Sequence, residues 1–381
     1  MAISVTVIKE NLDRALKATA KNIESRPTLP VLGNVLIRTD ETRLEVTSVN
    51  MSLGTVITSY VGANIATAGA ITLPAKTLGD LVNLMANERV DLRVDEETLS
   101  ATLKCGKSKS TLRGIDADEF PSVPSVNQVD LVLNLSELRV IINSVTFSAA
   151  ADDNRPILTG VYTLLEGDTM TMASADGYRL AVATIKLDET FKNPVEMVIP
   201  AKSLDTLSKL LSGDDNPVEI CFPTDRDIIT FSTRNFAMSA QLLEGRFPDF
   251  RAIIPRQYNT QIVADREDLA KACQRAEIFA RDNYFSGYLT ATPPQSHTEH
   301  GVLKIASKST QSGDNEGVVD AFIEGEKLEL SFNIKYLLDI LKVVSTERVV
   351  IESAGSSHPA TIRPEGDVDN RVYVIMPMAI R

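Results

Sequence analysis

One segment of the chain recurs three times, about one domain length apart, and this repeat limits the possible folds more than any other feature. The residues Leu-Pro-Ala-Lys-Thr-Leu beginning at Leu73 recur as Ile-Pro-Ala-Lys-Ser-Leu beginning at Ile199, 126 positions later. A third copy, Phe-Asn-Ile-Lys-Tyr-Leu, begins at Phe332, a further 133 positions along. A period of this length is that of a whole domain rather than of a short solenoid repeat. The 381 residues therefore predict three related domains.

A second repeated signature marks the domain boundaries. Phe120 precedes a proline in the first third, and Phe247 precedes a proline in the second third, 127 positions later. The stretches 121–130 and 255–260, which follow these signatures, contain proline and small or polar residues and are typical of linkers. We therefore predict domains at residues 1–127, 128–258 and 259–381.

The hydrophobic pattern predicts an α+β fold. Apolar residues recur at helical spacing in 9–22, 75–86, 136–147, 201–211, 265–281 and 333–344. Between these segments the pattern alternates with period two, as in 90–94 and 228–232, which is typical of half-buried strands. Each domain thus consists of two units of a strand, a helix and several strands. We expect antiparallel sheets that are covered by helices on one face.

Similarities to catalytic motifs are weak. The segment 101–108 is one residue away from a phosphate-binding P-loop, but no helix follows it, so we interpret it as a hairpin. His297 and His300 have no third metal ligand nearby, and His358 has no acidic or cysteine partner in the sequence. We therefore predict no active site, no metal and no cofactor.

The composition favours a cytoplasmic protein. Three widely spaced cysteines form neither a disulfide framework nor a metal motif, which fits a reducing compartment. No apolar run approaches the roughly 20 residues that span a bilayer. The first ten residues lack the apolar block of a signal peptide.

Charge is segregated by sign. The net charge of −12 would ordinarily argue against a nucleic-acid partner. On the first predicted helix, however, Leu12 and Leu16 share one face while Arg14, Lys17 and Lys21 form a basic stripe on the opposite face. Summed over the six helical segments the charge is about +4, against about −16 elsewhere. An electropositive helix surface in an acidic protein can hold a polyanion through its phosphates, without reading bases.

Four motifs resemble those of bacterial DNA polymerase III beta subunits, the sliding clamps. They are Arg-Pro-Thr-Leu-Pro-Val-Leu-Gly-Asn at 26–34, Ala-Asp-Gly-Tyr-Arg-Leu-Ala at 175–181, Gly-Arg-Phe-Pro-Asp at 245–249 and Tyr-Val-Ile-Met-Pro-Met at 373–378. The resemblance covers the whole chain in order. It implies a head-to-tail homodimer, a ring of six domains in which twelve helices line the hole and sheets lie outside. Double-stranded DNA would pass through the ring without sequence preference.

The resemblance also implies partners and their sites. A clamp loader would open one interface, and DNA polymerases and repair proteins would insert short peptide motifs into an apolar pocket. Carried over by position, that pocket comprises Leu158, Gly177, Tyr178, Arg179, Leu180, Pro248, Ile253, Pro359, Val374, Met376, Pro377 and Met378. The dimer interface would use Leu112, Ile278 and Phe279, and DNA contacts would come from Arg14, Lys17, Lys21, Arg26 and Lys202.

The sequence departs from the family pattern in two places. Pro156 and Ile157 stand where some clamps carry aromatic residues that touch DNA, and Ser110 stands where the dimer interface can be apolar. The main alternative is a multidomain scaffold that binds proteins without encircling DNA. A nucleotide-dependent enzyme that uses the segment 106–108 is the weakest hypothesis.

Overall fold

The computed structural model describes residues 3–40, 42–124, 128–152, 154–223, 227–294, 301–366 and 370–378. His297, His300 and the predicted boundary at residue 127 lie outside these residues. The chain forms two compact units, and each is described by itself. Unit 1 comprises residues 1–139 and 202–242, and unit 2 comprises residues 140–201 and 243–381.

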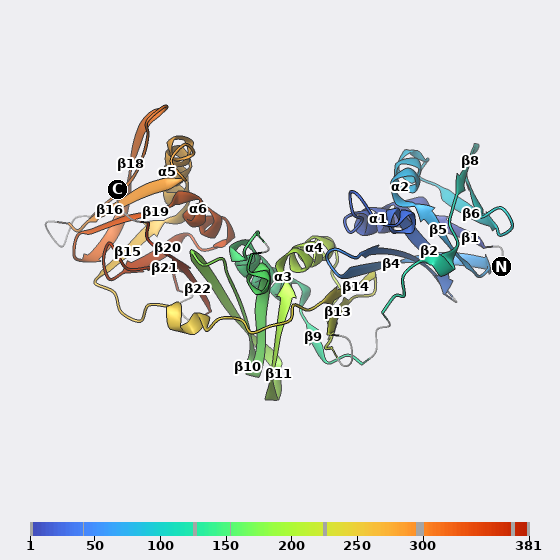
Figure 1. Ribbon diagram of the computed structural model, residues 1–381, viewed down its shortest axis with the longest axis horizontal. Coiled ribbons are helices and arrows are strands. Elements are labelled where there is room, and N and C mark those ends of the chain that lie inside the picture. Colours follow the sequence, from blue (N-terminus) through green and yellow to red (C-terminus); the bar gives the residue numbers. More distant parts are fainter. Residues whose placement is uncertain are drawn as a thin grey trace. The chain divides into compact units, whose positions relative to one another are not determined.

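The described strands of unit 1 form one antiparallel sheet of twelve strands (Figure 1). Nine of them follow the spatial order β8-β7-β6-β1-β4-β14-β13-β12-β9, and β2, β3 and β5 branch from β4 through β3. Helices α1 and α2 contact each other, and α1 packs on β3 and β4. The elements are β1 (Ser4–Ile8), α1 (Lys9–Ala20), β2 (Asn34–Asp40), β3 (Arg43–Asn50), β4 (Thr55–Thr67), β5 (Ala70–Pro74), α2 (Ala75–Leu84), β6 (Arg89–Asp95), β7 (Ser100–Cys105), β8 (Ser108–Arg113), β9 (Leu131–Leu133), α4 (Ala201–Leu211), β12 (Val218–Cys221), β13 (Ile228–Ser232) and β14 (Phe236–Gln241).

Unit 2 contains a second antiparallel sheet, with the order β10-β11-β22-β21-β20-β15-β18-β17-β16-β19. Helices α5 and α6 lie side by side, and α5 packs on β15 to β18 (Figure 1). The elements are β10 (Gly160–Ala175), β11 (Arg179–Pro200), β15 (Thr260–Asp265), α5 (Arg266–Ala280), β16 (Ser286–Thr292), β17 (Gly301–Ser309), β18 (Gly313–Gly325), β19 (Leu328–Asn333), α6 (Ile334–Val343), β20 (Arg348–Ser353), β21 (Ala360–Pro364) and β22 (Arg371–Ile375). Helix α3 (Leu135–Val145) begins in unit 1 and ends in unit 2.

Each sheet continues across one of the predicted domain boundaries. In unit 1, β14 pairs with β4, so that Met238 lies opposite Ile57. In unit 2, β11 pairs with β22, so that Leu180 lies opposite Val374. Backbone hydrogen bonds thus join strands of the central segment to strands of the first and third segments. The exact domain boundaries remain predictions, whereas the α+β class with antiparallel sheets is confirmed.

The six helices of the described chain begin within one residue of their predicted starts, and local chemistry explains their ends. Asp265 caps α5 by accepting a hydrogen bond from the Asp268 amide at 2.9 Å. Helix α1 ends at Ala20, two residues before its predicted end. The reason is that buried Asn22 donates its side-chain amide to the Thr55 carbonyl at 3.2 Å, which holds this turn against the sheet.

Alternation along the strands separates the core from the solvent. A core cluster in unit 1 joins the buried face of α1, represented by Leu12 and Leu16, to strand residues such as Ile37 and Leu103. All three cysteines are buried, and burial raises the pKa of the Cys273 thiol to about 12. These thiols are therefore core residues rather than reactive groups.

The P-loop-like segment is a hairpin, as interpreted. Strands β7 and β8 pair from Ser100 opposite Arg113 to Cys105 opposite Ser108, with Gly106 at the turn at a φ of 55°. A hairpin does not converge backbone amides on a phosphate in the way that a helix start does. Among the described strands, β8 is the edge of its sheet, because β7 is its one partner there.

Candidate functional site

The five predicted DNA contacts all lie in unit 1 and are all exposed. Arg14 and Lys17 lie on the outer face of α1, opposite the buried Leu12 and Leu16, and Lys21 directly follows the last residue of the helix. Lys17 is partly neutralised, because its Nζ donates to Asp13 at 2.7 Å. Within the described part of the chain, the other four form no ion pair; they are Arg14, Lys21, Arg26 and Lys202. These four charges are available to a phosphate backbone.

The predicted pocket residues all lie in unit 2, and three of them form a buried apolar floor. Leu158, Leu180 and Val374 belong to one buried cluster, in which they are 5%, 2% and 1% exposed. The pairing of Leu180 with Val374 across β11 and β22 sets two of them side by side. Segments far apart in the sequence therefore build one apolar surface.

Three exposed apolar side chains adjoin this floor in the sequence. Tyr178 is 63% exposed, Ile253 is 42% exposed and Met376 is 38% exposed. The Met376 amide donates to the Tyr178 carbonyl at 2.9 Å, so the strand pairing continues to the position of Met376. Pro248 is also exposed and lies between two buried aromatic residues in the sequence. Exposed apolar groups beside a buried floor are suited to receive apolar side chains of a ligand.

A tight turn carries Gly177 and presents Tyr178 and Arg179. The Asp176 carboxylate accepts hydrogen bonds from the amides of Tyr178, at 2.8 Å, and Arg179, at 3.0 Å. Gly177 has a φ of 94°, which a side chain disfavours. The Arg155 guanidinium closes the turn by donating to the Asp176 carbonyl at 2.7 Å. Hydrogen bonds between side chains and the backbone thus fix how this turn enters β11.

One further predicted pocket residue, Pro377, lines an apolar cavity of unit 2. The same cavity is lined by Ile375, Phe332, Leu337 and His358. Pro359 follows His358, and the Met378 amide donates to the Ser331 carbonyl at 2.7 Å. His358, for which the sequence offers no acidic or cysteine partner, thus lines the same cavity as Pro377 of the Met-Pro-Met segment.

An aromatic cluster supports the floor, and sequence reasoning did not assign it to the site. Phe247 stacks on Tyr162 with ring centroids 5.6 Å apart, and Phe250 lies 5.7 Å from the same ring. Ile157 packs against this cluster from the position where some clamps carry an aromatic residue. The sequence signal that could have indicated this cluster is the repeated signature that contains Phe120 and Phe247. Both phenylalanines are buried, as a repeated structural position would require.

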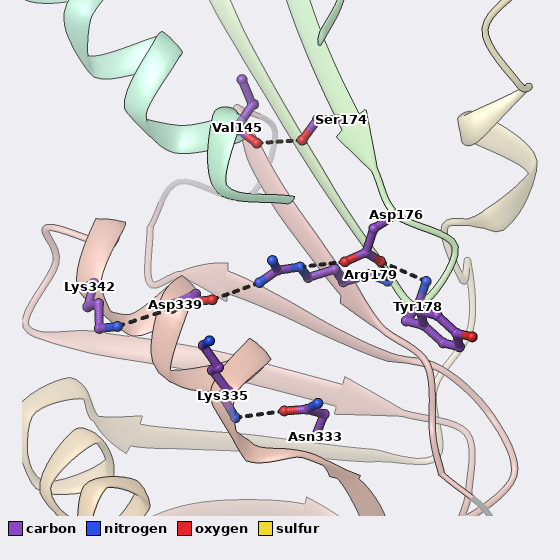
Figure 2. A network of polar contacts seen from close by, with 9 residues as sticks. All are labelled: Val145, Ser174, Asp176, Tyr178, Arg179, Asn333, Lys335, Asp339 and Lys342. Atoms are coloured by element: carbon purple, nitrogen blue, oxygen red, sulfur yellow. Dashed lines mark hydrogen bonds and ion pairs between the residues drawn. The ribbon is translucent and has the colours of Figure 1, made fainter. Parts of the chain in front are cut away.

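A polar network holds the side chain of Arg179 (Figure 2). Its Nε donates to Asp176 and its Nη1 donates to Asp339 on α6, both at 2.9 Å. The guanidinium lies 4.5 Å from the ring centroid of Tyr336. Burial raises the pKa of the Tyr336 hydroxyl, and the nearby Asp176 carboxylate raises it further. Lys342 donates to the second oxygen of Asp339 at 3.1 Å.

The predicted interface residues lie on surfaces that an assembly can use. Leu112 is half-buried on the edge strand β8. In α5, Ile278 is 56% exposed, and Phe279 is half-buried beside it. Residues 313–320 of β18 pair with β17 only, because β15 pairs with residues 321–325. Both units thus carry a strand edge without a neighbour in the described chain.

Comparison with known families decides what kind of protein this is. Three family models of the DNA polymerase III beta subunit match the chain in order: the N-terminal domain at residues 3–124, the central domain at 132–249 and the C-terminal domain at 251–379. The chain belongs to the DNA polymerase III beta subunit family. The resemblance of its motifs to sliding clamps is therefore confirmed.

Relatives across bacteria agree with this assignment. The chain is 31% identical to the beta sliding clamp of Synechococcus elongatus and 30% identical to that of Pseudomonas aeruginosa, in both cases over 98% of this chain and 99% of the relative. Among solved structures, the Bacillus subtilis DNA polymerase sliding clamp is 28% identical with a TM-score of 0.92, and each chain is covered completely. A sliding-clamp function is thus supported, and the scaffold alternative is not favoured.

Within the described residues, no three His, Cys, Asp or Glu side chains gather as a metal site would require. No helix in that part of the chain has the length and apolar character needed to span a bilayer.

Proposed function

We propose that this clamp-family protein forms a head-to-tail homodimeric ring that encircles duplex DNA and tethers a polymerase as a non-catalytic processivity subunit. The observation that carries the proposal is the segregation of charge on α1. Its apolar face is buried against the sheet, while Arg14 and Lys21 are exposed without an ion-pair partner in the described chain. Cationic side chains on one helix face contact phosphates without reading bases, which permits the protein to slide along DNA.

The ring closes, in this proposal, between the first domain of one subunit and the third domain of the other. Strand β8 presents Leu112 at an open sheet edge, and α5 presents Ile278 and Phe279 beside the open part of β18. Edges that find no partner within a chain are the places where another chain can add. A clamp loader would open this contact, and work on replicating DNA fits the expected cytoplasmic location.

Client polymerases and repair proteins bind, in this proposal, through short peptides at the floor formed by Leu158, Leu180 and Val374. A buried apolar floor with exposed Tyr178 and Met376 beside it fits an extended peptide with apolar anchors. Methionine side chains adapt to different partners. A sliding clamp of Pseudomonas aeruginosa that is 29% identical to this chain has been solved bound to griselimycin, which shows a ligand site in that protein.

Retention on circular DNA tests the ring. The protein, loaded on a nicked plasmid by a bacterial clamp loader with ATP, should stay bound through gel filtration and be released when the plasmid is cut once. Equal retention on the cut plasmid would refute encirclement, because a topological link cannot survive a free end.

A peptide titration tests the pocket. A labelled peptide from the C-terminus of a client polymerase should bind Met376→Ala about 5–30-fold more weakly than the parent, as expected for a loss of about 1–2 kcal/mol. Met51→Ala is the matched control, because Met51 is 61% exposed and lies in unit 1. Equal affinity in the parent and Met376→Ala would remove this site.

A further inference from the structure

The Arg179 guanidinium is held unusually firmly for a pocket side chain. Two carboxylates from different elements bind it, since Asp176 precedes β11 and Asp339 lies on α6 (Figure 2). The Arg179 side chain is 12% exposed, and the two carboxylates are 16% and 18% exposed. The ring of Tyr336 covers the guanidinium at 4.5 Å, and that of Phe147 lies 5.5 Å away. The plane of the Arg179 guanidinium is therefore fixed before any ligand binds.

The network is also electrically balanced. Asp339 shares its two oxygens between Arg179 and Lys342, at 2.9 Å and 3.1 Å. Two cations, Arg179 and Lys342, thus face two anions, Asp176 and Asp339. The Arg179 guanidinium has five N–H donors, of which two serve these carboxylates. The Nη2 group makes no hydrogen bond to the described residues and can donate to a ligand.

We propose that Asp339 is a positioning residue and a specificity determinant of the peptide pocket, because it fixes and neutralises Arg179. This inference rests on the proposed peptide-binding function. An arginine that is already neutralised offers hydrogen bonds to a carbonyl oxygen but little net attraction to a carboxylate. An acidic residue beside the apolar anchors of a peptide therefore gains little affinity over a neutral one.

Removing one charge from the network should change this preference in a direction set by the charge removed. Asp339→Asn leaves a net charge of +1 near Arg179, which favours a peptide with a carboxylate. Lys342→Met leaves a net charge of −1, which disfavours the same peptide. Lys342 is 66% exposed, so its effect is screened by solvent and is the smaller of the two.

Twin peptides measure this preference. Both are labelled ten-residue peptides with two leucine anchors; one carries glutamine beside the anchors and the other carries glutamate. The parent should bind the glutamine peptide at least as well as its twin. Asp339→Asn should shift the affinity ratio toward the glutamate peptide by about tenfold, and this shift should shrink as salt is added. Lys342→Met should shift the ratio by about twofold the other way.

Matched controls come from a similar ion pair on the neighbouring helix. Lys271 and Asp268 of α5 have the same spacing of three residues, lie 3.7 Å apart and do not contact Arg179. Asp268→Asn and Lys271→Met should keep the parent ratio. Asp339→Glu, which restores the charge, should return the ratio toward that of the parent.

The outcomes separate the two proposals. A parent that binds neither peptide would refute the proposed pocket itself. A parent that binds the glutamine peptide, with unchanged ratios in both Asp339→Asn and Lys342→Met, would overturn the role of Asp339 and leave the pocket standing. Lys342→Met keeps the test decisive if Asp339→Asn fails to fold, because Lys342 is exposed.

Discussion

Gly177 allows the turn that carries Tyr178 and Arg179 to be tested by one substitution. Gly177 has a φ of 94°, and a Cβ there would lie 2.8 Å from Nη2 of Arg155. Gly313 provides a matched control in the same unit, since its φ is 97° and nothing lies within 4 Å of its Cβ position. Replacing either glycine by alanine costs about 1–2 kcal/mol of backbone strain.

The hydrogen bonds of Asp176 decide how the turn responds to Gly177→Ala. Relieving the strain by a backbone rearrangement would break its bonds to the Tyr178 and Arg179 amides, at about 1.5–3 kcal/mol each. Because this loss exceeds the strain, the turn should keep its conformation. The Arg155 guanidinium should move instead and lose its bond to the Asp176 carbonyl, at about 0.5–1.5 kcal/mol.

Urea denaturation and peptide titration together check this reasoning. Gly177→Ala should lower the free energy of unfolding by about 1.5–3.5 kcal/mol, and Gly313→Ala should lower it by about 1–2 kcal/mol. Peptide affinity should fall less than about threefold in Gly177→Ala, since Tyr178 and Arg179 stay in place. The reasoning fails if Gly177→Ala is no less stable than Gly313→Ala but has lost peptide binding, because the turn has then rearranged.

Three further predictions address assembly, DNA binding and pH. Leu112→Asp places an unpaired charge at the proposed interface and should sediment as a monomer at about 1 µM. The control Leu84→Asp, at an exposed site in the same unit, should remain a dimer. If Leu112→Asp sediments as a dimer, the interface does not include Leu112. Lys202→Ala should reduce the salt dependence of DNA binding by about one unit of slope per contact removed, whereas Lys104→Ala on β7 should leave it unchanged; an unaltered slope in Lys202→Ala would exclude that contact. Burial raises the pKa of the Asp214 carboxyl, but hydrogen bonds from Asn216 and Thr233 outweigh this effect and hold the pKa below its usual value. The stabilisation by the Asp214 carboxylate is therefore present above about pH 4 and lost at lower pH. The difference in unfolding free energy between the parent and Asp214→Asn should thus shrink from about pH 6 to about pH 3, and a constant difference would contradict the assignment.

Periodicity and repeats were sufficient to predict the helices and the fold class. Leu12 and Leu16 mark the buried face of α1 because a helix that covers a sheet must bury one stripe, and this spacing is visible in the sequence. The hairpin at β7 and β8 was predictable for a similar reason, since no helical pattern follows Gly106. Local patterns of this kind depend only on neighbours along the chain.

The polar part of the site was not predictable in this way. Arg179 and Asp339 are 160 positions apart, and no periodicity connects them. Their contact depends on the pairing of β11 with β22 and on the packing of α6, which are properties of the folded unit. The joining of β14 to β4 was likewise missed, because an exposed strand edge and a paired one can have the same alternation of residues.

The edge strand β8 has a consequence for the newly made chain, before it meets a partner. A strand edge that stays open for the proposed assembly is also a template for aggregation. Along β8, Lys109 and Arg113 are exposed, while Leu112 is the only apolar side chain. Charged residues on an edge oppose indiscriminate strand addition, since a misaligned copy would bring like charges together. The same strand can thus keep the unassembled chain from aggregating and still offer one apolar residue to a correctly aligned partner.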